Sequence, residues 1–465
     1  MIPGENNEET MPQLQRSEKP RAKRPDDTRP FIHDAGRPFR GPANMATVTI
    51  AMVLLALAVG FVVGFLVFLV MNLSTWLTAL LWDGVGSSLG VTWFPLVMCI
   101  TGGLVIGLWT HFSGSRVEPL EKVMATFRAT GSYRLDGTGK AAISFLLPLV
   151  FGGSIGFEAG LTGLITAGCC WIRDKLKAAG LREAAVADVT IAASIAAIFG
   201  TPFAGIVAGA ESTKPDDTDP LAETNVDDYN MRRPAKIVLY TAAAFGAFAG
   251  IRVFSALFGA SAGFPHFDII GSEGAGYLWV LLAVAAAYLM AVLYHASRTL
   301  TGRLATSLGD DARGTVLKPV IAGAAIGLMA TFFPYVLFPG EVQSHELMQT
   351  WTTWTAAALI LTGALKAVAT PMCINLGWVG GNFCPSIFAG AACGYGIAML
   401  TGADPMLMVT VVTSGFLAGV MRKPLLAIAI LMLCFPIESI VWMGLSAIVL
   451  AALPLPPILT TDDKM

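Results

Sequence analysis

Charge is scarce in this sequence. Only 13% of its 465 residues are Asp, Glu, Lys or Arg, whereas 55% are hydrophobic, and the formal net charge is −2. A soluble domain exposes much more charge, so this composition predicts a polytopic membrane protein embedded in a lipid bilayer. The near-neutral balance gives no indication of a nucleic-acid partner.

The chain also lacks the residue spacings of metal, disulfide and hydrolytic sites. Its seven cysteines lie in apolar stretches, and neither they nor the five histidines show a C-x-x-C or Cys/His spacing. No H-E-x-x-H motif and no phosphate-binding G-x-x-x-x-G-K-[ST] loop occurs. We therefore expect no metal, no cofactor and no enzymatic activity, and we interpret the cysteines as small buried hydrophobic residues.

Charge-free runs divide the chain into membrane segments. Residues 46–82 carry no charge at all, which is more than the roughly 20 residues that one span needs. Many later apolar runs are interrupted by Gly or Pro, as in transporters whose broken helices line a polar site. We expect a disordered cytoplasmic tail (1–44), a first transmembrane half (45–235) that ends in a cytoplasmic linker (213–235), a second half (236–459) and a short cytoplasmic tail (460–465).

The distribution of basic residues predicts the orientation. Lys and Arg gather in the polar segments 113–140, 173–183, 212–236 and 298–318, and they are absent from 83–88, 257–276 and 339–347. Loops rich in Lys and Arg stay on the cytoplasmic side of a membrane. The first set is therefore expected to be cytoplasmic, together with both termini, and the second external, in a multi-pass protein of the cell membrane.

One carboxylate lies within an apolar, glycine-rich stretch. Residues 152–160 have the sequence G-G-S-I-G-F-E-A-G, and no Lys or Arg occurs between Lys140 and Arg173. An ionisable group at membrane depth is costly and by default marks a functional site. Glycines also allow a ligand to approach the main chain closely. Glu158 is therefore the first candidate site residue, the alternative being a carboxylate that only satisfies local amides at a helix end.

A second region resembles the first. Residues 377–385 have the sequence G-W-V-G-G-N-F-C-P and also open a helix of small residues. Each region is followed by an X-Pro helix break, at Pro202 in the first and at Pro424 in the second. Paired interruptions in two halves of a membrane protein point to a binding site between repeats near the midplane.

Glycine-rich turns that open helices favour an anion as the ligand. Such a turn offers unpaired backbone N–H groups and the positive end of the helix dipole. Two inward-directed ends would hold an anion without a cationic side chain, weakly enough for release. A cation site would instead use carbonyls and several carboxylates. A secondary transporter that binds a coupling cation at Glu158 is the alternative from a different class.

In order and spacing, these motifs resemble those of the CLC family of chloride channels and chloride/proton antiporters. Gly156–Gly160 is similar to the family's G-R-E-G-P, Gly381–Pro385 to G-x-F-x-P, and Arg422–Leu425 to R-A-P-L. Ile198–Gly205, followed by Glu211, resembles A-F-N-A-P-L-A-G-I. The resemblance covers residues 90–457, most of the chain.

The resemblance implies an all-α inverted-repeat fold with many broken and tilted helices. It also implies a homodimer with one anion path per subunit, and chloride transport as a channel or by proton-coupled antiport. Glu158 would be the gating carboxylate, which swings out of the anion site when it is protonated. The anion-binding positions carried over are Gly156, Phe157, Ala159, Asn382, Phe383 and Ser115, with Glu211, Ser212, Lys366 and Pro456 as secondary positions.

Several departures from the family pattern bear on the anion and on proton coupling. The family's G-S-G-I-P appears only as G-S-R-V-E-P, which contains Ser115. The family's late tyrosine falls near Pro456, and the antiporters' inner glutamate falls at Ser212. We expect no CBS domain after the second half. These departures leave open chloride or fluoride as the anion, and a channel or an antiporter as the mechanism. We interpret Lys366 as mainly structural, with a secondary effect on the anion.

Overall fold

The computed structural model describes residues 50–86, 93–114, 137–161, 163–165, 167–168, 206, 233–258, 266–267, 276–432, 434–456 and 459. All of them belong to one structural unit, Met45–Met465. The expected tails over 1–44 and 460–465 lie outside the described residues, as does the linker up to residue 232.

Within these ranges the secondary structure is helical, apart from one isolated β-bridge. The α-helices are α1 (Ile50–Ala79), α3 (Phe94–Ser113), α5 (Thr138–Val150), α9 (Arg233–Phe258), α10 (Val280–Ser307), α11 (Ala312–Phe332), α12 (Glu341–Thr350), α13 (Ala356–Asn375), α14 (Phe383–Thr401), α15 (Pro405–Met421), α16 (Pro424–Leu431) and α17 (Ile440–Ala452). Shorter turns are the π-helix η1 (Leu80–Val85) and the 3₁₀ helices η3 (Tyr277–Trp279), η4 (Pro334–Val336), η5 (Trp351–Thr353) and η6 (Ile437–Ser439).

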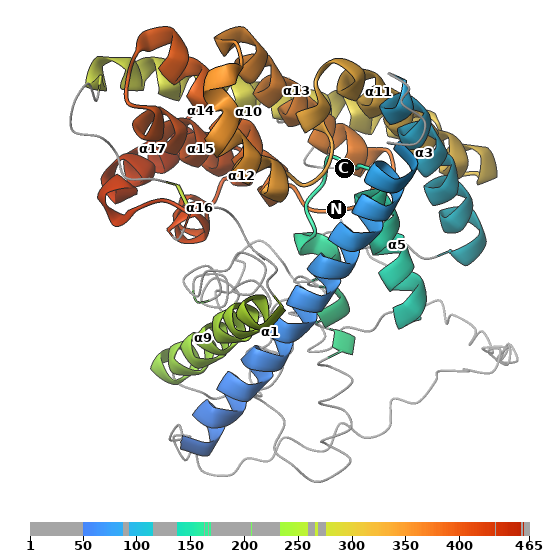
Figure 1. The fold of residues 1–465 in the computed structure, drawn as a ribbon, viewed down its shortest axis with the longest axis horizontal. Coiled ribbons are helices and arrows are strands. Elements are labelled where there is room, and N and C mark those ends of the chain that lie inside the picture. Colours follow the sequence, from blue (N-terminus) through green and yellow to red (C-terminus); the bar gives the residue numbers. More distant parts are fainter. Residues whose placement is uncertain are drawn as a thin grey trace, which may run out of the picture. The chain divides into compact units, whose positions relative to one another are not determined.

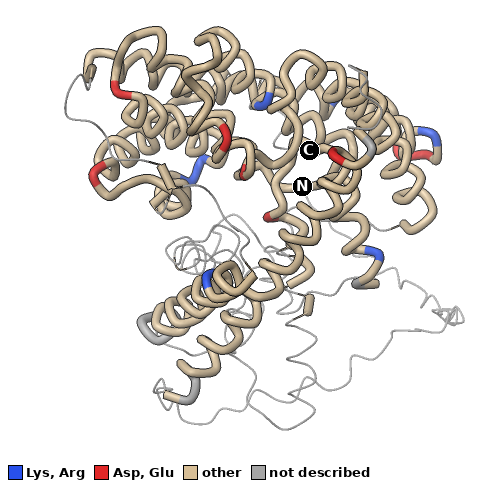
Figure 2. The backbone as a smooth tube through the Cα atoms, in the orientation of Figure 1, with Lys and Arg blue, Asp and Glu red and all other residues tan. Residues whose placement is uncertain are grey.

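Seven helices in the described part of the chain are long and apolar enough to cross a membrane. They are Val53–Gly84, Phe94–Ser113, Ile237–Phe258, Tyr277–Ser307, Ala312–Phe332, Ala356–Asn375 and Phe383–Thr401. Few charged positions interrupt the tube in Figure 2. Large apolar side chains such as Leu54, Leu281 and Val441 are exposed, as expected where lipid surrounds a helix. The prediction of an all-helical polytopic membrane protein is confirmed.

Small residues let the helices approach closely. Gly103 and Gly107 of α3 face the backbone of α11, where an added Cβ would overlap Pro319 and Val316. In the same way, Gly60 of α1 lies against the backbone of Ala243 in α9. Both pairs lie side by side in Figure 1. Helices in lipid are not held together by the hydrophobic effect. Glycine at these contacts lets the backbones approach closely, so that van der Waals packing can hold the helices together.

Helix α14 is the most buried of the seven spans, because 89% of its most apolar 18-residue stretch is buried inside the protein. It packs between α13 and α15 (Figure 1). Gly390 and Gly394 bring it against Thr413 and Val409 of α15, while Gly363 of α13 approaches from the other side. The burial of α14 therefore fixes the position of its N-terminus, which carries the second Gly-rich turn.

The helix break predicted at Pro424 is confirmed. Helix α15 ends at Met421, the next residue, Arg422, has a left-handed φ of 57°, and Pro424 begins α16. The Arg422 guanidinium donates to the carbonyls of Ala451 and Leu453 at the end of α17, at 2.9 and 2.6 Å, as cations do at helix C-termini. The matching break at Pro202 lies outside the described residues.

Candidate functional site

The two glycine-rich turns have the same local structure. Helix α5 is followed by Gly152 at φ 90°, and α13 by Gly377 at φ 93°. In both turns the residue after this glycine donates its N–H to the carbonyl five residues earlier. Because the same backbone bonds recur at equivalent positions, the two regions are a structural repeat, as their sequences predict.

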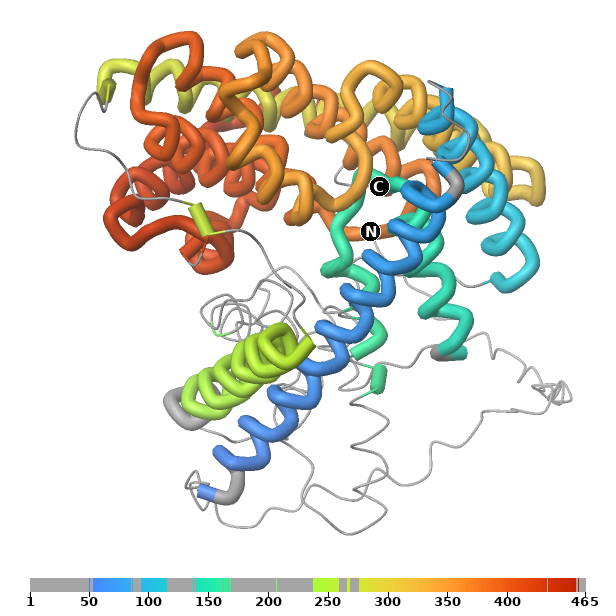
Figure 3. The backbone as a smooth tube through the Cα atoms, in the orientation of Figure 1, coloured from blue at the N-terminus to red at the C-terminus, as the bar shows by residue number. Residues whose placement is uncertain are grey.

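The repeats meet at a single antiparallel bridge. Gly156 and Gly381 exchange two backbone hydrogen bonds, each 2.7 Å long. The segment after α5 runs beside the segment before α14 in Figure 3. Reciprocal bonds between equivalent residues are what a two-fold axis between the two segments produces. The bridge therefore places the start of the helix that follows Phe157 opposite the start of α14, as an inverted repeat requires.

Glu158 reaches across this bridge to the other repeat. Its Oε1 accepts the N–H of Phe383 at 2.6 Å, and its Oε2 lies 3.4 Å from the Cys384 Sγ, which donates to it. The side chain is only 1% exposed. Glu158 and Phe383 are 225 residues apart and hold equivalent positions after the bridged glycines. The carboxylate of one repeat thus occupies the N-terminus of the helix in the other.

The bridged glycines make room for this carboxylate. A Cβ added at Gly381 would overlap the Glu158 side chain, and one added at Gly156 would overlap its carboxylate. Both positions therefore require glycine because of the contact, in addition to any demand of the turn. The N–H of Gly156 is engaged in the bridge, so in this conformation it holds the two segments together.

Asn382 immediately precedes α14 but does not cap it. Its Nδ2 instead donates to the Tyr294 hydroxyl on α10, at 3.1 Å. Tyr294 is buried, with 3% of its surface exposed, and its ring contacts Phe416 edge-on. Helix α10 thus contributes to a site whose other residues come from the two repeats.

Lys366 is a fully buried lysine on α13, the helix that packs directly against α14. Its Nζ lies within 3.3 Å of the four successive carbonyls of Tyr335 to Phe338 and 4.8 Å above the ring of Phe388. No ion pair to Lys366 occurs among the described residues. The carbonyls replace water around the ammonium, an arrangement that fits the structural role predicted for Lys366.

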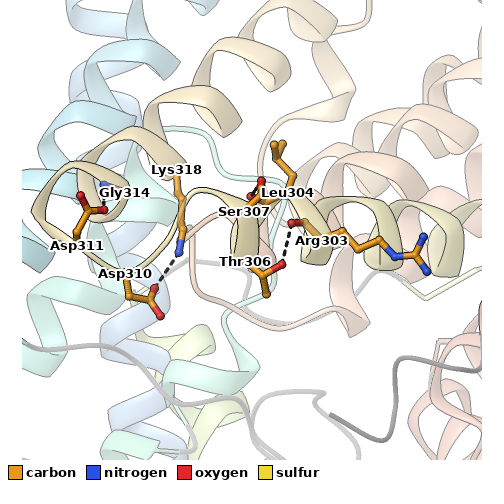
Figure 4. Close-up of polar contacts among 8 residues, drawn as sticks. All are labelled: Arg303, Leu304, Thr306, Ser307, Asp310, Asp311, Gly314 and Lys318. Atoms are coloured by element: carbon orange, nitrogen blue, oxygen red, sulfur yellow. Dashed lines mark hydrogen bonds and ion pairs between the residues drawn. The ribbon is translucent and has the colours of Figure 1, made fainter.

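Two cavities lie next to the two turns. One, of about 250 Å³, is lined by Phe157 together with Asp83 and Glu341. The other, of about 320 Å³, is lined by Gly377 and Val379 and by polar side chains from the ends of α10 and α11. At this second cavity, Lys318 points to Asp310 and forms an ion pair of 2.8 Å (Figure 4).

The remaining predicted site residues lie in different places. Ala159 is buried in the first helical turn after Phe157. Pro456 follows α17 and accepts the N–H of Leu459 at 2.9 Å. Ser115, Glu211 and Ser212 lie outside the described residues.

Sequence reasoning missed two side chains at the site. Cys384 was interpreted only as a buried hydrophobic residue; its burial is confirmed, but its thiol also contacts Glu158. Its place directly after Phe383 in the second turn was an available signal. Tyr294 lies on a separate helix 88 residues before Asn382, and no sequence pattern connects the two. In the described ranges no cluster of His, Cys, Asp or Glu is placed to hold a metal.

Comparison with known proteins identifies the family. A family model described as "Voltage gated chloride channel" matches residues 102–453. The chain belongs to this family. Its members are channels and transporters rather than enzymes. The resemblance predicted from the sequence is thereby confirmed.

Curated relatives match part of the chain. Chloride channel protein CLC-e of Arabidopsis thaliana is 27% identical over 186 residues, which are 36% of this chain and 26% of that protein. A ClcB-like chloride channel protein of Ralstonia nicotianae is 32% identical over 187 residues, 37% of this chain and 40% of that protein. The aligned region thus spans less than half the length of either relative.

Solved structures share the fold over nearly the whole chain. A CLC-type fluoride/proton antiporter superposes with a TM-score of 0.65 at 15% identity, covering 86% of this chain and 94% of its own. A slow cyanobacterial Cl⁻/H⁺ antiporter gives 0.64 at 18% identity, with 87% and 95% covered. At these identities the likeness establishes the CLC fold.

Proposed function

We propose that this protein moves a small anion across a membrane and that Glu158 is its gating carboxylate. The observation that carries the proposal is the bond from the Phe383 N–H to the Glu158 Oε1, 2.6 Å long and buried. A helix N-terminus binds anions through its unpaired N–H groups and its dipole. A carboxylate is itself an anion, so Glu158 competes with a transported anion for the same donors.

The transported anion takes the place of the carboxylate when Glu158 withdraws. The amides of Phe383 and Asn382 bind it from one repeat, and those of Phe157 and Ala159 approach it from the other. Gly156 holds the turn through its bond to Gly381. Ser115 is a further candidate for an anion contact. Protonation of Glu158 weakens its hold on the amides and favours the anion.

Chloride is the proposed anion, with fluoride as the alternative within the same family. The solved relatives with similar TM-scores include one described as a fluoride/proton antiporter and one as a Cl⁻/H⁺ antiporter. The donors around Glu158 are backbone N–H groups and a thiol, which suit either ion. The protein works either as a channel or as a proton-coupled antiporter. Measurements of anion flux together with proton flux distinguish these two mechanisms.

A cation-coupled transporter is the competing function. Such a site would turn carbonyls and several carboxylates toward its ligand. Glu158 instead faces N–H and S–H donors from the start of α14. A cation placed beside this carboxylate would meet the positive end of a helix, so the geometry favours an anion.

The test is a flux measurement in liposomes. The full-length protein is reconstituted, and efflux of chloride and of fluoride is recorded together with proton movement. Glu158→Gln is compared with wild type and with Glu438→Gln, which removes an exposed carboxylate in η6. We expect Glu158→Gln to raise efflux severalfold at neutral pH and to remove its pH dependence, while Glu438→Gln leaves both unchanged.

Each outcome separates the alternatives. Efflux without proton movement identifies a channel, and efflux with stoichiometric counterflow identifies an antiporter. If neither anion moves, the anion function is wrong. If Glu158→Gln keeps both the rate and the pH profile of wild type, Glu158 is not the gate.

Orientation and assembly complete the proposal. The end of α10 with Arg303 and the start of α11 with Lys318 (Figure 4) face the cytoplasm of a cell membrane by the positive-inside rule. The termini lie on the same side, and the protein is a homodimer with one anion path per subunit. Labelling of single cysteines from each side tests the orientation, and light scattering in detergent tests the dimer.

A further inference from the structure

The cavity beside Phe157 has the size and the walls of a small-molecule site. It measures about 250 Å³, and the aromatic side chains of Trp82, Phe145, Phe157 and Phe338 line it. An apolar cavity of about 150 Å³ holds a benzene ring, so this cavity has room for a ring and a further group. Small-molecule sites combine such apolar walls with a few polar groups.

Hydrogen bonds and a ring contact fix the aromatic wall. The Trp82 Nε1 donates to the Val150 carbonyl at 3.0 Å, and its ring lies against Gly152 and edge-on to Phe338, with 5.0 Å between the ring centroids. The Phe338 N–H donates to the Gly152 carbonyl at 3.2 Å, and its carbonyl accepts from Lys366. Because the wall is already ordered, a ligand loses little affinity to ordering it.

The charged side chains that line the cavity are all acidic. Asp83 and Glu341 lie on it, and no Lys, Arg or His occurs among the described residues that line it. Both acids belong to segments that lack Lys and Arg and are expected to be external, 83–88 and 339–347. Two negative charges attract a cation and repel an anion, so the cavity complements a cation and not the transported anion.

The acidic side of the cavity is connected to the start of α14. Gly340, which precedes Glu341, packs against Phe388 of α14. The Glu341 carboxylate interacts electrostatically with the Cys384 thiol, which in turn donates to the Glu158 Oε2. A positive charge bound near Glu341 therefore acts on the proposed gate.

We propose that this cavity binds a small organic cation, an ammonium group that carries one apolar ring, and that the bound cation keeps Glu158 on α14. The ring lies between the aromatic walls, and the ammonium lies near Asp83 and Glu341, where the face of Trp82 adds a cation–π contact. A nearby positive charge favours the ionised carboxylate, so the bound cation slows anion efflux. The effect on efflux rests on the proposed function, whereas the binding does not.

Calorimetry on the full-length protein in detergent tests the binding. Benzyltrimethylammonium is the probe, and hydrocinnamate, an anion of similar size that also carries one ring, is its matched control. We expect the cation to bind saturably and the anion to bind about tenfold more weakly or not at all. Asp83→Asn and Glu341→Gln should each weaken binding of the cation by about two- to fivefold, because each removes one partly solvated charge.

Two further variants make the result specific. Glu438→Gln removes an exposed carboxylate outside the cavity and should leave cation binding unchanged. Val342→Trp adds bulk to a cavity-lining residue that is 60% exposed, so the fold tolerates it and binding is lost. The unfolding temperature of each variant, measured without ligand, verifies that it is folded.

Liposome efflux tests the action on the gate. External benzyltrimethylammonium should slow chloride efflux of wild type severalfold and have no effect on Glu158→Gln, because that variant has no carboxylate to hold. Equal affinity for the cation and for hydrocinnamate overturns the inference, as does cation binding that Asp83→Asn, Glu341→Gln and Val342→Trp leave unchanged. Cation binding without slower efflux overturns the action on Glu158. If wild type moves neither chloride nor fluoride, the proposed function fails, and calorimetry still decides whether the cavity binds cations.

Discussion

Glu158 and Phe383 occupy equivalent positions in the two repeats and are hydrogen-bonded to each other, with 2.6 Å between the carboxylate oxygen and the backbone nitrogen. The bridged pair Gly156 and Gly381 lies two residues before them. A symmetric backbone thus carries an asymmetric pair of side chains. One repeat supplies an acidic side chain, and the other supplies the N–H that receives it.

The first prediction concerns the space around that carboxylate. Gly381→Ala places a Cβ onto Glu158, and overpacking of this kind costs about 1–3 kcal/mol. We expect a lower unfolding temperature in detergent and efflux that loses its pH dependence, because the carboxylate is displaced. The double variant Gly381→Ala, Glu158→Ala should recover most of the thermal stability.

Gly444→Ala is the control for this experiment. Nothing lies within 4 Å of a Cβ added at Gly444 in α17, so stability and flux should match wild type. If the stability loss in Gly381→Ala persists after Glu158 is truncated, glycine is required at this position for the backbone conformation and not to make room for the carboxylate.

The second prediction concerns Cys384. Its thiol donates to the Glu158 Oε2, so Cys384→Ala removes a donor that holds the carboxylate in place. A hydrogen bond contributes about 1 kcal/mol, and we expect chloride efflux at neutral pH to rise by about two- to fivefold. Cys393→Ala removes another buried free thiol from α14 and should leave efflux unchanged. Equal effects of the two substitutions would contradict a specific role for Cys384.

The third prediction concerns Lys366. Lys366→Met leaves the carbonyls of residues 335–338 buried without their donor, at a cost of about 3 kcal/mol. A clear drop in unfolding temperature follows. Lys318→Met removes a lysine whose partner, Asp310, is 77% exposed, so it should cost about 0–1 kcal/mol. Comparable losses in both variants would show that the carbonyl cradle adds little.

Local signals made the two turns and the second helix break predictable. Glycine and proline constrain the backbone wherever they occur, so Gly377, Gly381 and Pro424 indicated a turn, a close approach and a helix start from sequence alone. The scarcity of charge around Glu158 indicated burial. These features depend on a few neighbouring residues, and the structure confirms them.

Contacts formed in three dimensions were not predictable in the same way. The cradle of Lys366 is built from main-chain carbonyls, which every residue possesses, so no residue type marks its position. The bond between Asn382 and Tyr294 joins α14 to a helix with no motif of its own. The contact of the Cys384 thiol with Glu158 was not predicted, because buried cysteines generally behave as small hydrophobic residues.

The bridge between Gly156 and Gly381 has a consequence for speed. Its two hydrogen bonds use only main-chain atoms, so the Glu158 carboxylate can leave the α14 N-terminus by rotation about its own side-chain bonds while both repeats stay fixed. Side-chain rotations are faster by orders of magnitude than collective helix or domain movements. For the gate that we propose at Glu158, the rate of anion exchange is then set by the energy needed to detach one carboxylate.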